Sequence, residues 1–117
     1  MKNWLQKNRD EQEPAGFPKD GEEAKAPIRR YRFVFYGRVQ GVGFRWRVRM
    51  AAGALGLTGW VANEWDGSVR MEIQGTDAEI AQVLSGLTGD RYIDITEFEQ
   101  EEIPLQPKER SFRVGGY

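Results

Sequence analysis

The chain has 117 residues with 17 basic and 18 acidic side chains, and its formal net charge is −1. This length suits one domain with a single modest core, and the near-neutral charge disfavours a nucleic-acid-binding protein. The sequence contains no Cys and no His, which excludes disulfides, thiol or histidine phosphoenzymes and nearly all zinc sites. Any catalysis must therefore use arginine, amide, hydroxyl, carboxylate or backbone groups.

The first 26 residues differ in composition from the rest of the chain. They are rich in charged residues, Gln and Pro, and after Met1 their only large apolar side chains are Trp4, Leu5 and Phe17. Such a segment cannot bury enough apolar surface to order itself, so we expect a flexible charged leader and one domain over residues 27–117. The uncharged stretch 50–63 is shorter than a bilayer span, and the chain is small and charged. These features predict a cytoplasmic monomer with no membrane partner.

The first two predicted elements are a strand and a helix. Residues 31–36 alternate in character and are rich in aromatic and β-branched side chains, which predicts a strand. Its core-facing residues would be Tyr31, Phe33 and Phe35. Apolar residues then recur at helical spacing from Phe44 to Leu55, and Gly56 is typical of a helix end.

A hairpin and a second helix are predicted next. Residues 60–64 and 68–74 flank Asp66-Gly67, a dipeptide that suits a tight turn between two strands. Thr76 and Glu79 have the spacing of a capping box. The apolar stripe that follows, closed by a glycine at position 89, predicts a helix that buries Ile80, Val83, Leu84 and Leu87.

Two further strands complete the predicted fold. Residues 92–100 are strand-like, but their alternation slips, which predicts a bulge near Thr96 or Glu97. Phe112 and Val114 mark a short last strand. The order β-α-β-β-α-β predicts an α+β, ferredoxin-like sandwich in which both helices pack on one face of an antiparallel sheet. We interpret the acidic run 94–102 as a solvated strand face. The sequence leaves open whether the sheet face carrying Arg32, Val34 and Tyr36 pairs with another molecule.

A glycine-rich loop lies between the first strand and the first helix. Residues 37–45 read Gly-Arg-Val-Gln-Gly-Val-Gly-Phe-Arg, and residues 24–63 contain eight basic side chains but no Asp or Glu. Glycines let backbone N–H groups converge on an anion, a helix N-terminus adds partial positive charge, and a guanidinium binds two oxygens in parallel. The third glycine of a dinucleotide-binding loop and the Lys-Ser/Thr pair of a Walker loop are both missing. Spacing alone leaves open an anion site or a structural turn.

Further motifs make the sequence more specific. They are Leu-Gly-Leu-Thr-Gly-Trp-Val-Ala-Asn at residues 55–63, Asp-Gly-Ser-Val at 66–69, Gln-Gly at 74–75 and Phe-Arg-Val at 112–114. Together with the glycine-rich loop, they make residues 28–117 resemble the acylphosphatase family. The resemblance implies a small enzyme that hydrolyses the carboxyl-phosphate bond of an acyl phosphate, with no metal and no cofactor.

The resemblance also implies a role for individual residues. Arg45 matches the family's phosphate-binding arginine, and Asn63 matches its water-orienting asparagine. The phosphate would also be bound by backbone amides of the loop residues Val39, Gln40, Gly41, Val42, Gly43 and Phe44. An acyl phosphate already has a good leaving group, so charge neutralisation and an in-line water are the main needs. No strong base is obvious near Asn63, so we hypothesise that the substrate's own phosphate accepts the water proton.

Some positions depart from the family pattern, and others receive no chemical role. Arg47 occupies a position where a small hydroxyl residue is common, and residues 89–92 lack the usual Gly-Pro turn. We assign no chemical role to Arg38 or Gln40, whose amide would satisfy backbone groups. Aromatic residues in strands and helices usually pack in the core or at its rim, so we expect core packing for Trp46, Trp60 and Trp65.

Two other functions fit parts of the sequence. One is a non-catalytic module of the same fold that binds phosphate or carbamoyl phosphate, against which the matched Arg45 and Asn63 argue. The other is an RNA-recognition module, in which exposed strand aromatics stack on bases. The second fits poorly because the chain is acidic and the third predicted strand, residues 69–73, has no aromatic residue.

Overall fold

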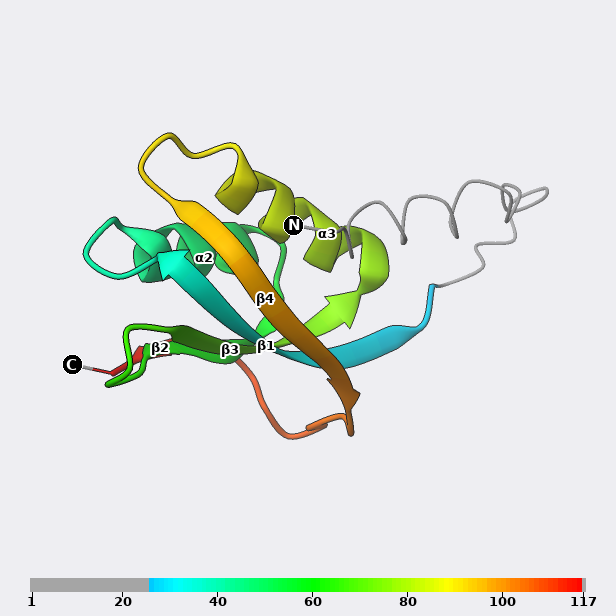
Figure 1. Ribbon diagram of the computed structural model, residues 1–117. Helices are drawn as coiled ribbons and strands as arrows, with labels where there is room; N and C mark the ends of the chain where they lie inside the picture. Colours follow the sequence, from blue (N-terminus) through cyan, green and yellow to red (C-terminus); the bar gives the residue numbers. More distant parts are fainter. Residues whose placement is uncertain (1–25, 117) are drawn as a thin grey trace.

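The computed structural model describes residues 26–116, so the predicted leader lies, apart from its last residue, outside the described part. Residues 26–116 form five strands and two helices in one domain (Figure 1). In chain order these are β1 (Ile28–Arg38), α2 (Phe44–Ala54), β2 (Thr58–Asn63), β3 (Val69–Thr76), α3 (Asp77–Thr88), β4 (Asp94–Ile103) and β5 (Phe112–Gly115). Each predicted element is present, with ends that shift by a few residues. Neither helix of this described part has the length and apolarity needed to cross a bilayer.

The strands form one sheet in the order β4-β1-β3-β2-β5, and both helices lie on the same face of it (Figure 1). All neighbouring strands are antiparallel except β2 and β5, which run parallel. The predicted α+β sandwich is confirmed, but the sheet is mixed rather than fully antiparallel. The reason is the connection after β4: residues 104–111 pass below the open face of the sheet, from one edge to the other (Figure 1).

The core lies between the helices and the sheet, as the alternation predicted. Tyr31, Phe33 and Phe35 of β1 are all buried, and the Phe35 ring lies 5.1 Å from that of Phe44 on α2. The apolar stripe of α3 is buried as well. At the start of α3, the Thr76 hydroxyl accepts a hydrogen bond from the Glu79 amide at 3.2 Å, and the Glu79 carboxylate accepts one from the Thr76 amide at 3.1 Å. The predicted capping box is confirmed.

The predicted bulge is also present. Tyr36 pairs with Glu97 and the next residue, Gly37, pairs with Ile95, so Thr96 is the extra residue of β4. This insertion reverses the alternation within β4, which explains why a simple period of two does not describe its sequence.

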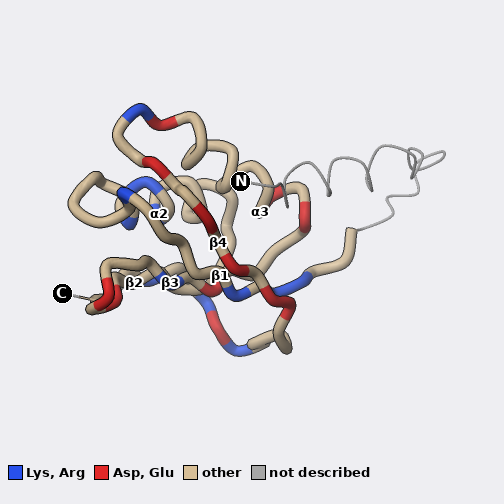
Figure 2. Tube along the Cα trace, in the orientation of Figure 1, with Lys and Arg blue, Asp and Glu red and all other residues tan. Residues whose placement is uncertain are grey.

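The opposite face of the sheet carries the charges of β1 and β4. Acidic residues follow one another along β4, and basic residues lie on β1 and α2 (Figure 2). Arg32 forms an ion pair with Glu101, and the Tyr36 hydroxyl donates a hydrogen bond to Glu99 at 3.0 Å. The acidic run is therefore exposed, as predicted, but its carboxylates also pair with the neighbouring strand. Val34, which lies between these pairs, is only 7% exposed, so it offers little apolar surface on this face.

Candidate active site

The glycine-rich loop ends at the N-terminus of α2. Gly41 and Gly43 have φ angles of 72° and 80°, a left-handed conformation that other residues rarely adopt. Gly43 is the N-cap of α2, where no side chain from residues 26–116 caps the helix and the first turn has no acidic residue. A Cβ atom at either glycine would meet nothing within 4 Å, so the loop faces open space. The first N–H groups of α2 are thus left without a capping side chain.

Arg45 lies in the first turn of α2 and reaches the last strand. Its Nη1 atom donates a hydrogen bond to the Gly115 carbonyl of β5 at 2.6 Å. The pairing of β5 with β2 therefore determines where this guanidinium lies. One Nη atom is engaged with the protein, and the other N–H donors of the fork have no acceptor among residues 26–116.

Asn63 is the last residue of β2, directly beside β5. Its Oδ1 atom is buried and accepts no hydrogen bond from any residue in the described part. A buried acceptor without a partner costs about 1–3 kcal/mol. Such an atom, in a residue that lines a hollow, is suited to accept a hydrogen bond from a bound molecule.

Arg45 and Asn63 line the same hollow, which we call the α2 hollow, with a volume of about 320 Å³. It lies between the glycine-rich loop, α2 and the β2–β5 edge of the sheet. Its lining residues are Val39, Gly41, Gly43, Phe44, Arg45, Trp46, Arg49, Asn63 and Val114. The lining has two guanidinium groups and no carboxylate, so its electrostatic potential favours an anion. Its composition suits a phosphorylated ligand.

Gln40 fixes the glycine-rich loop relative to the hairpin that carries Asn63. Its Nε2 atom donates hydrogen bonds to the carbonyl oxygens of Glu64 and Ser68, both at 2.8 Å. These two carbonyls close the turn between β2 and β3, where Glu64 N also bonds Ser68 O. The side-chain amide of Gln40 thus satisfies backbone groups, as predicted. It also links the glycine-rich loop to the end of β2, where Asn63 lies. The side chains of Gln40 and Val42 do not line the α2 hollow. The prediction concerned only the backbone N–H groups of these two residues.

Comparison with known proteins decides the family. The acylphosphatase family model matches residues 31–114. The chain belongs to the acylphosphatase family. An acylphosphatase of Clostridium acetobutylicum is 35% identical over 88 residues, which cover 74% of this chain and 97% of that protein. One of Rhizobium etli is 44% identical over 81 residues, covering 68% and 86% respectively.

A solved structure agrees with this assignment. The crystal structure of acylphosphatase from Bacillus subtilis superposes with a TM-score of 0.67 at 30% sequence identity, covering 76% of this chain and 99% of that one. The predicted family and enzyme class, acylphosphatase, are thereby confirmed.

Two aromatic residues of this acylphosphatase lie where the sequence did not predict them. Trp46 is 63% exposed and Trp65 is 87% exposed, so the expectation of core packing is wrong for both, and Trp60 is only half-buried. The buried residues of α2 are Phe44, Val48 and Ala52, spaced four apart. Trp46 is two positions after Phe44 and so points about 200° away from that stripe. It lines the α2 hollow instead of the core.

Arg49 and Val114 also line the α2 hollow, although the sequence analysis gave neither a site role. A usable signal was present for Arg49, since a residue four positions after Arg45 lies on the same face of a helix. The position of Val114 at the hollow depends on the pairing of β5 with β2, which no local sequence pattern encodes.

The two departures from the family pattern contact each other in this acylphosphatase. Arg47 Nε lies 2.7 Å from Asp90 Oδ2, which ties α2 to the loop after α3. The other carboxylate oxygen of Asp90 accepts hydrogen bonds from the backbone N–H groups of Tyr92 and Ile93, at 2.7 and 3.2 Å. An aspartate turn thus stands in place of the missing Gly-Pro turn, and Arg47 is its partner.

Asp90 makes the stability of this region sensitive to acid. The Tyr92 N–H hydrogen bond, with the Arg47 charge, lowers the pKa of Asp90 below its ordinary value. A lowered pKa stabilises the fold above the unfolded-state pKa of about 3.9, and this contribution is lost as pH falls through the lower folded-state value. We expect Asp90→Asn to lower Tm at pH 7 and to differ less from wild type as pH falls below about 4. Thermal unfolding from pH 2 to 7 measures this; a constant Tm difference would contradict it.

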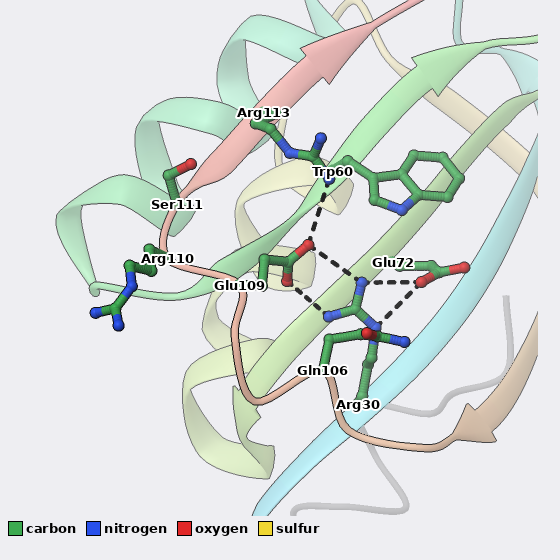
Figure 3. Close-up of a pocket in the computed structure, with 8 residues that line it drawn as sticks. All are labelled: Arg30, Trp60, Glu72, Gln106, Glu109, Arg110, Ser111 and Arg113. Carbon is green, nitrogen blue, oxygen red and sulfur yellow. Dashed lines mark hydrogen bonds and ion pairs between the residues drawn. The ribbon is translucent and has the colours of Figure 1, made fainter.

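A second hollow, of about 500 Å³, lies on the opposite side of the sheet (Figure 3). We call it the sheet-face hollow; it lies between the sheet and the loop after β4. Arg30 fills its floor and donates to Glu72 Oε1 at 2.9 Å and to Glu109 Oε1 at 2.7 Å. Burial raises the pKa of Glu109, but the hydrogen bond and charge of Arg30 outweigh burial and hold that pKa below its usual range. Because these charges already satisfy one another, the larger hollow is the weaker candidate for an active site.

Proposed function

We propose that this enzyme hydrolyses acyl phosphates to a carboxylate and inorganic phosphate in the α2 hollow. Arg45 and the backbone amides from Val39 to Phe44 would bind the phosphoryl group. The observation that carries the proposal is the shared hollow: Arg45, the open glycines and the partnerless Asn63 oxygen all line it. A monomer in the cytoplasm is the setting in which we expect this reaction.

The proposed binding step neutralises the phosphoryl charge. The guanidinium fork of Arg45 donates two parallel hydrogen bonds to phosphoryl oxygens, while the N–H groups at the start of α2 donate to the remaining oxygens. Gly41 and Gly43 keep this surface free of side chains, so the backbone approaches the anion directly. The hydrogen bond to Gly115 holds the arginine in place before the substrate arrives.

The proposed chemical step adds water at phosphorus. Asn63 Oδ1 accepts a hydrogen bond from the water. This bond directs a lone pair of the water oxygen at phosphorus, on the side opposite the acyl oxygen. The P–O bond to the acyl group breaks, and the acyl oxygen leaves as a carboxylate with the bonding electron pair. A phosphoryl oxygen of the substrate takes the water proton, because the lining holds no carboxylate that would do so.

The Asn63 carboxamide is tested by its removal. We expect Asn63→Ala to lower kcat for benzoyl phosphate by about 10²-fold while KM changes by less than about threefold, since the water is oriented only for the chemical step. Steady-state phosphate release measures both constants. Gln82→Ala, which removes an exposed carboxamide on α3, is the matched control and should behave as wild type. A loss confined to KM would show that Asn63 binds the substrate rather than the water.

The pH dependence of the rate tests the proton acceptor. Among residues 26–116, the lining of the α2 hollow consists of arginine, asparagine, glycine and apolar residues, with no histidine, cysteine or carboxylate to act as a base. We therefore expect kcat/KM for benzoyl phosphate to stay constant within about twofold from pH 6 to 8. A sigmoidal change with a midpoint between pH 6 and 7 that belongs to the free enzyme would instead reveal a protein base.

A further inference from the structure

The α2 hollow extends beyond the space that a phosphoryl group requires. We assign the loop residues from Val39 to Phe44, Arg45 and Asn63 to its phosphate end, and its remaining lining residues are Trp46, Arg49 and Val114. Trp46 and Arg49 project from α2, and Val114 belongs to β5. This second end of the hollow is where the acyl group of a substrate bound at Arg45 would lie.

Arg49 brings a positive charge to that second end. It is four positions after Arg45 on α2, so the two side chains leave the same helix face about one turn apart. Arg49 is exposed and makes no hydrogen bond or ion pair with any residue from 26 to 116. Its charge therefore has no counter-charge inside the hollow, in contrast with Arg30, Arg32 and Arg47, which all have carboxylate partners.

Trp46 and Val114 provide apolar surface next to this charge. Trp46 is 63% exposed and Val114 is 43% exposed, so both present apolar surface at the rim of the hollow. An exposed indole binds the flat or aliphatic part of a ligand well, because it offers a large rigid surface.

We propose that this enzyme prefers acyl phosphates whose acyl group carries a second negative charge. The apolar part of the acyl group lies between Trp46 and Val114, and its anionic end pairs with Arg49. This proposal rests on the function proposed above, in which Arg45 binds the phosphoryl group. It assigns the two guanidinium groups to opposite ends of one substrate.

Two aromatic substrates of nearly the same shape test the charge preference. They are 4-carboxybenzoyl phosphate, with an anionic end, and 4-carbamoylbenzoyl phosphate, with a neutral amide in the same place. The intrinsic reactivity of each substrate cancels when wild type and variant are compared on that substrate. We expect Arg49→Gln to lower kcat/KM about three- to tenfold for the carboxylate substrate and less than about 1.5-fold for the amide.

Matched variants separate the charge from its position. Arg49→Lys should keep about half of the preference, and added salt should reduce the preference in wild type and in Arg49→Lys but not in Arg49→Gln. Arg110→Gln removes an exposed arginine on the other side of the sheet, at a side chain that points away from the ion pairs in Figure 3, and should change neither substrate. If Arg49→Gln slows both substrates equally, Arg49 contacts the phosphoryl group and the proposal is wrong; if it slows neither, the proposal is also wrong.

The apolar part of the proposal has its own comparison. Trp46→Ala should lower kcat/KM for benzoyl phosphate about threefold more than for acetyl phosphate, which has no ring to pack. Equal losses on both would remove Trp46 from the acyl site. Failure of the underlying function is recognised separately, because wild type would then release no phosphate from benzoyl phosphate at all.

Discussion

Arg45→Ala is expected to lower kcat/KM for benzoyl phosphate by about 10³-fold, which corresponds to about 4 kcal/mol of transition-state stabilisation. The substrate phosphoryl group carries two negative charges near neutral pH. Residues 26–116 contain no cluster of acidic residues that could hold a metal ion, so no bound metal would replace the charge of Arg45 in the α2 hollow. Without Arg45, the phosphoryl oxygens lose a forked donor and its charge together. Because we propose that the guanidinium contacts the phosphoryl group before and during the reaction, KM should rise and kcat should fall. Phosphate release measured over a range of substrate concentrations gives both constants.

Two variants decide whether the loss arises from the geometry of Arg45. Arg45→Lys keeps the charge but not the planar fork, so we expect its kcat/KM to be only about tenfold higher than that of Arg45→Ala. Arg110→Ala removes an exposed arginine from the opposite side of the sheet and should retain wild-type rates. A kcat/KM within tenfold of wild type for Arg45→Ala would mean that the loop amides bind the phosphate without this residue.

The fold was predictable where local pattern and long-range structure agree. Alternating aromatics gave β1, a capping box gave the start of α3, and a slip in the alternation gave the bulge at Thr96. The parallel pairing of β5 with β2 was not predictable in the same way. It depends on where residues 104–111 cross the sheet, and that path is held by tertiary contacts rather than by turn chemistry.

The site was predictable for residues that the glycine-rich loop positions, and less so for the others. Arg45 follows that loop directly, so its place at the helix start can be read from sequence. Asn63 alone is an ordinary strand-end asparagine, and only the motif around it singled it out. Arg49 is one of seven arginines between residues 24 and 63, and composition does not distinguish an arginine that lines the α2 hollow from those in ion pairs.

Arg30 is the clearest case of a residue whose role the sequence hides. It is one of two adjacent arginines in a basic stretch, yet it is only 1% exposed. Its guanidinium donates to Glu72, Gln74 and Glu109. Burial lowers the pKa of Arg30, but the hydrogen bonds that Arg30 donates to Glu109 and Glu72 outweigh burial and raise that pKa above its usual value. Figure 3 shows how this one side chain joins two strands to the loop that leads into β5.

Arg30→Met is expected to lower the free energy of unfolding by about 3–5 kcal/mol at pH 7. Methionine keeps much of the side-chain volume, so the loss comes mainly from the carboxylates of Glu72 and Glu109, which remain close together without a cation. The cost should shrink as pH falls, because protonation of these carboxylates removes their repulsion in the variant. Urea unfolding at pH 7 and at pH 4 measures both effects.

Arg32→Met is the matched control for this prediction. Arg32 lies two residues further along the same strand, on the same face, and pairs with Glu101, but its side chain is 43% exposed. Water and salt screen such a pair, so its loss should cost no more than about 1 kcal/mol. The contrast between the two arginines tests burial together with the second carboxylate partner, since strand, face and residue type are the same. Equal costs for both variants would mean that the sheet-face hollow admits enough water to screen Arg30 as well. Contacts other than those of Arg30 would then hold the loop that leads into β5, the strand whose Gly115 binds Arg45.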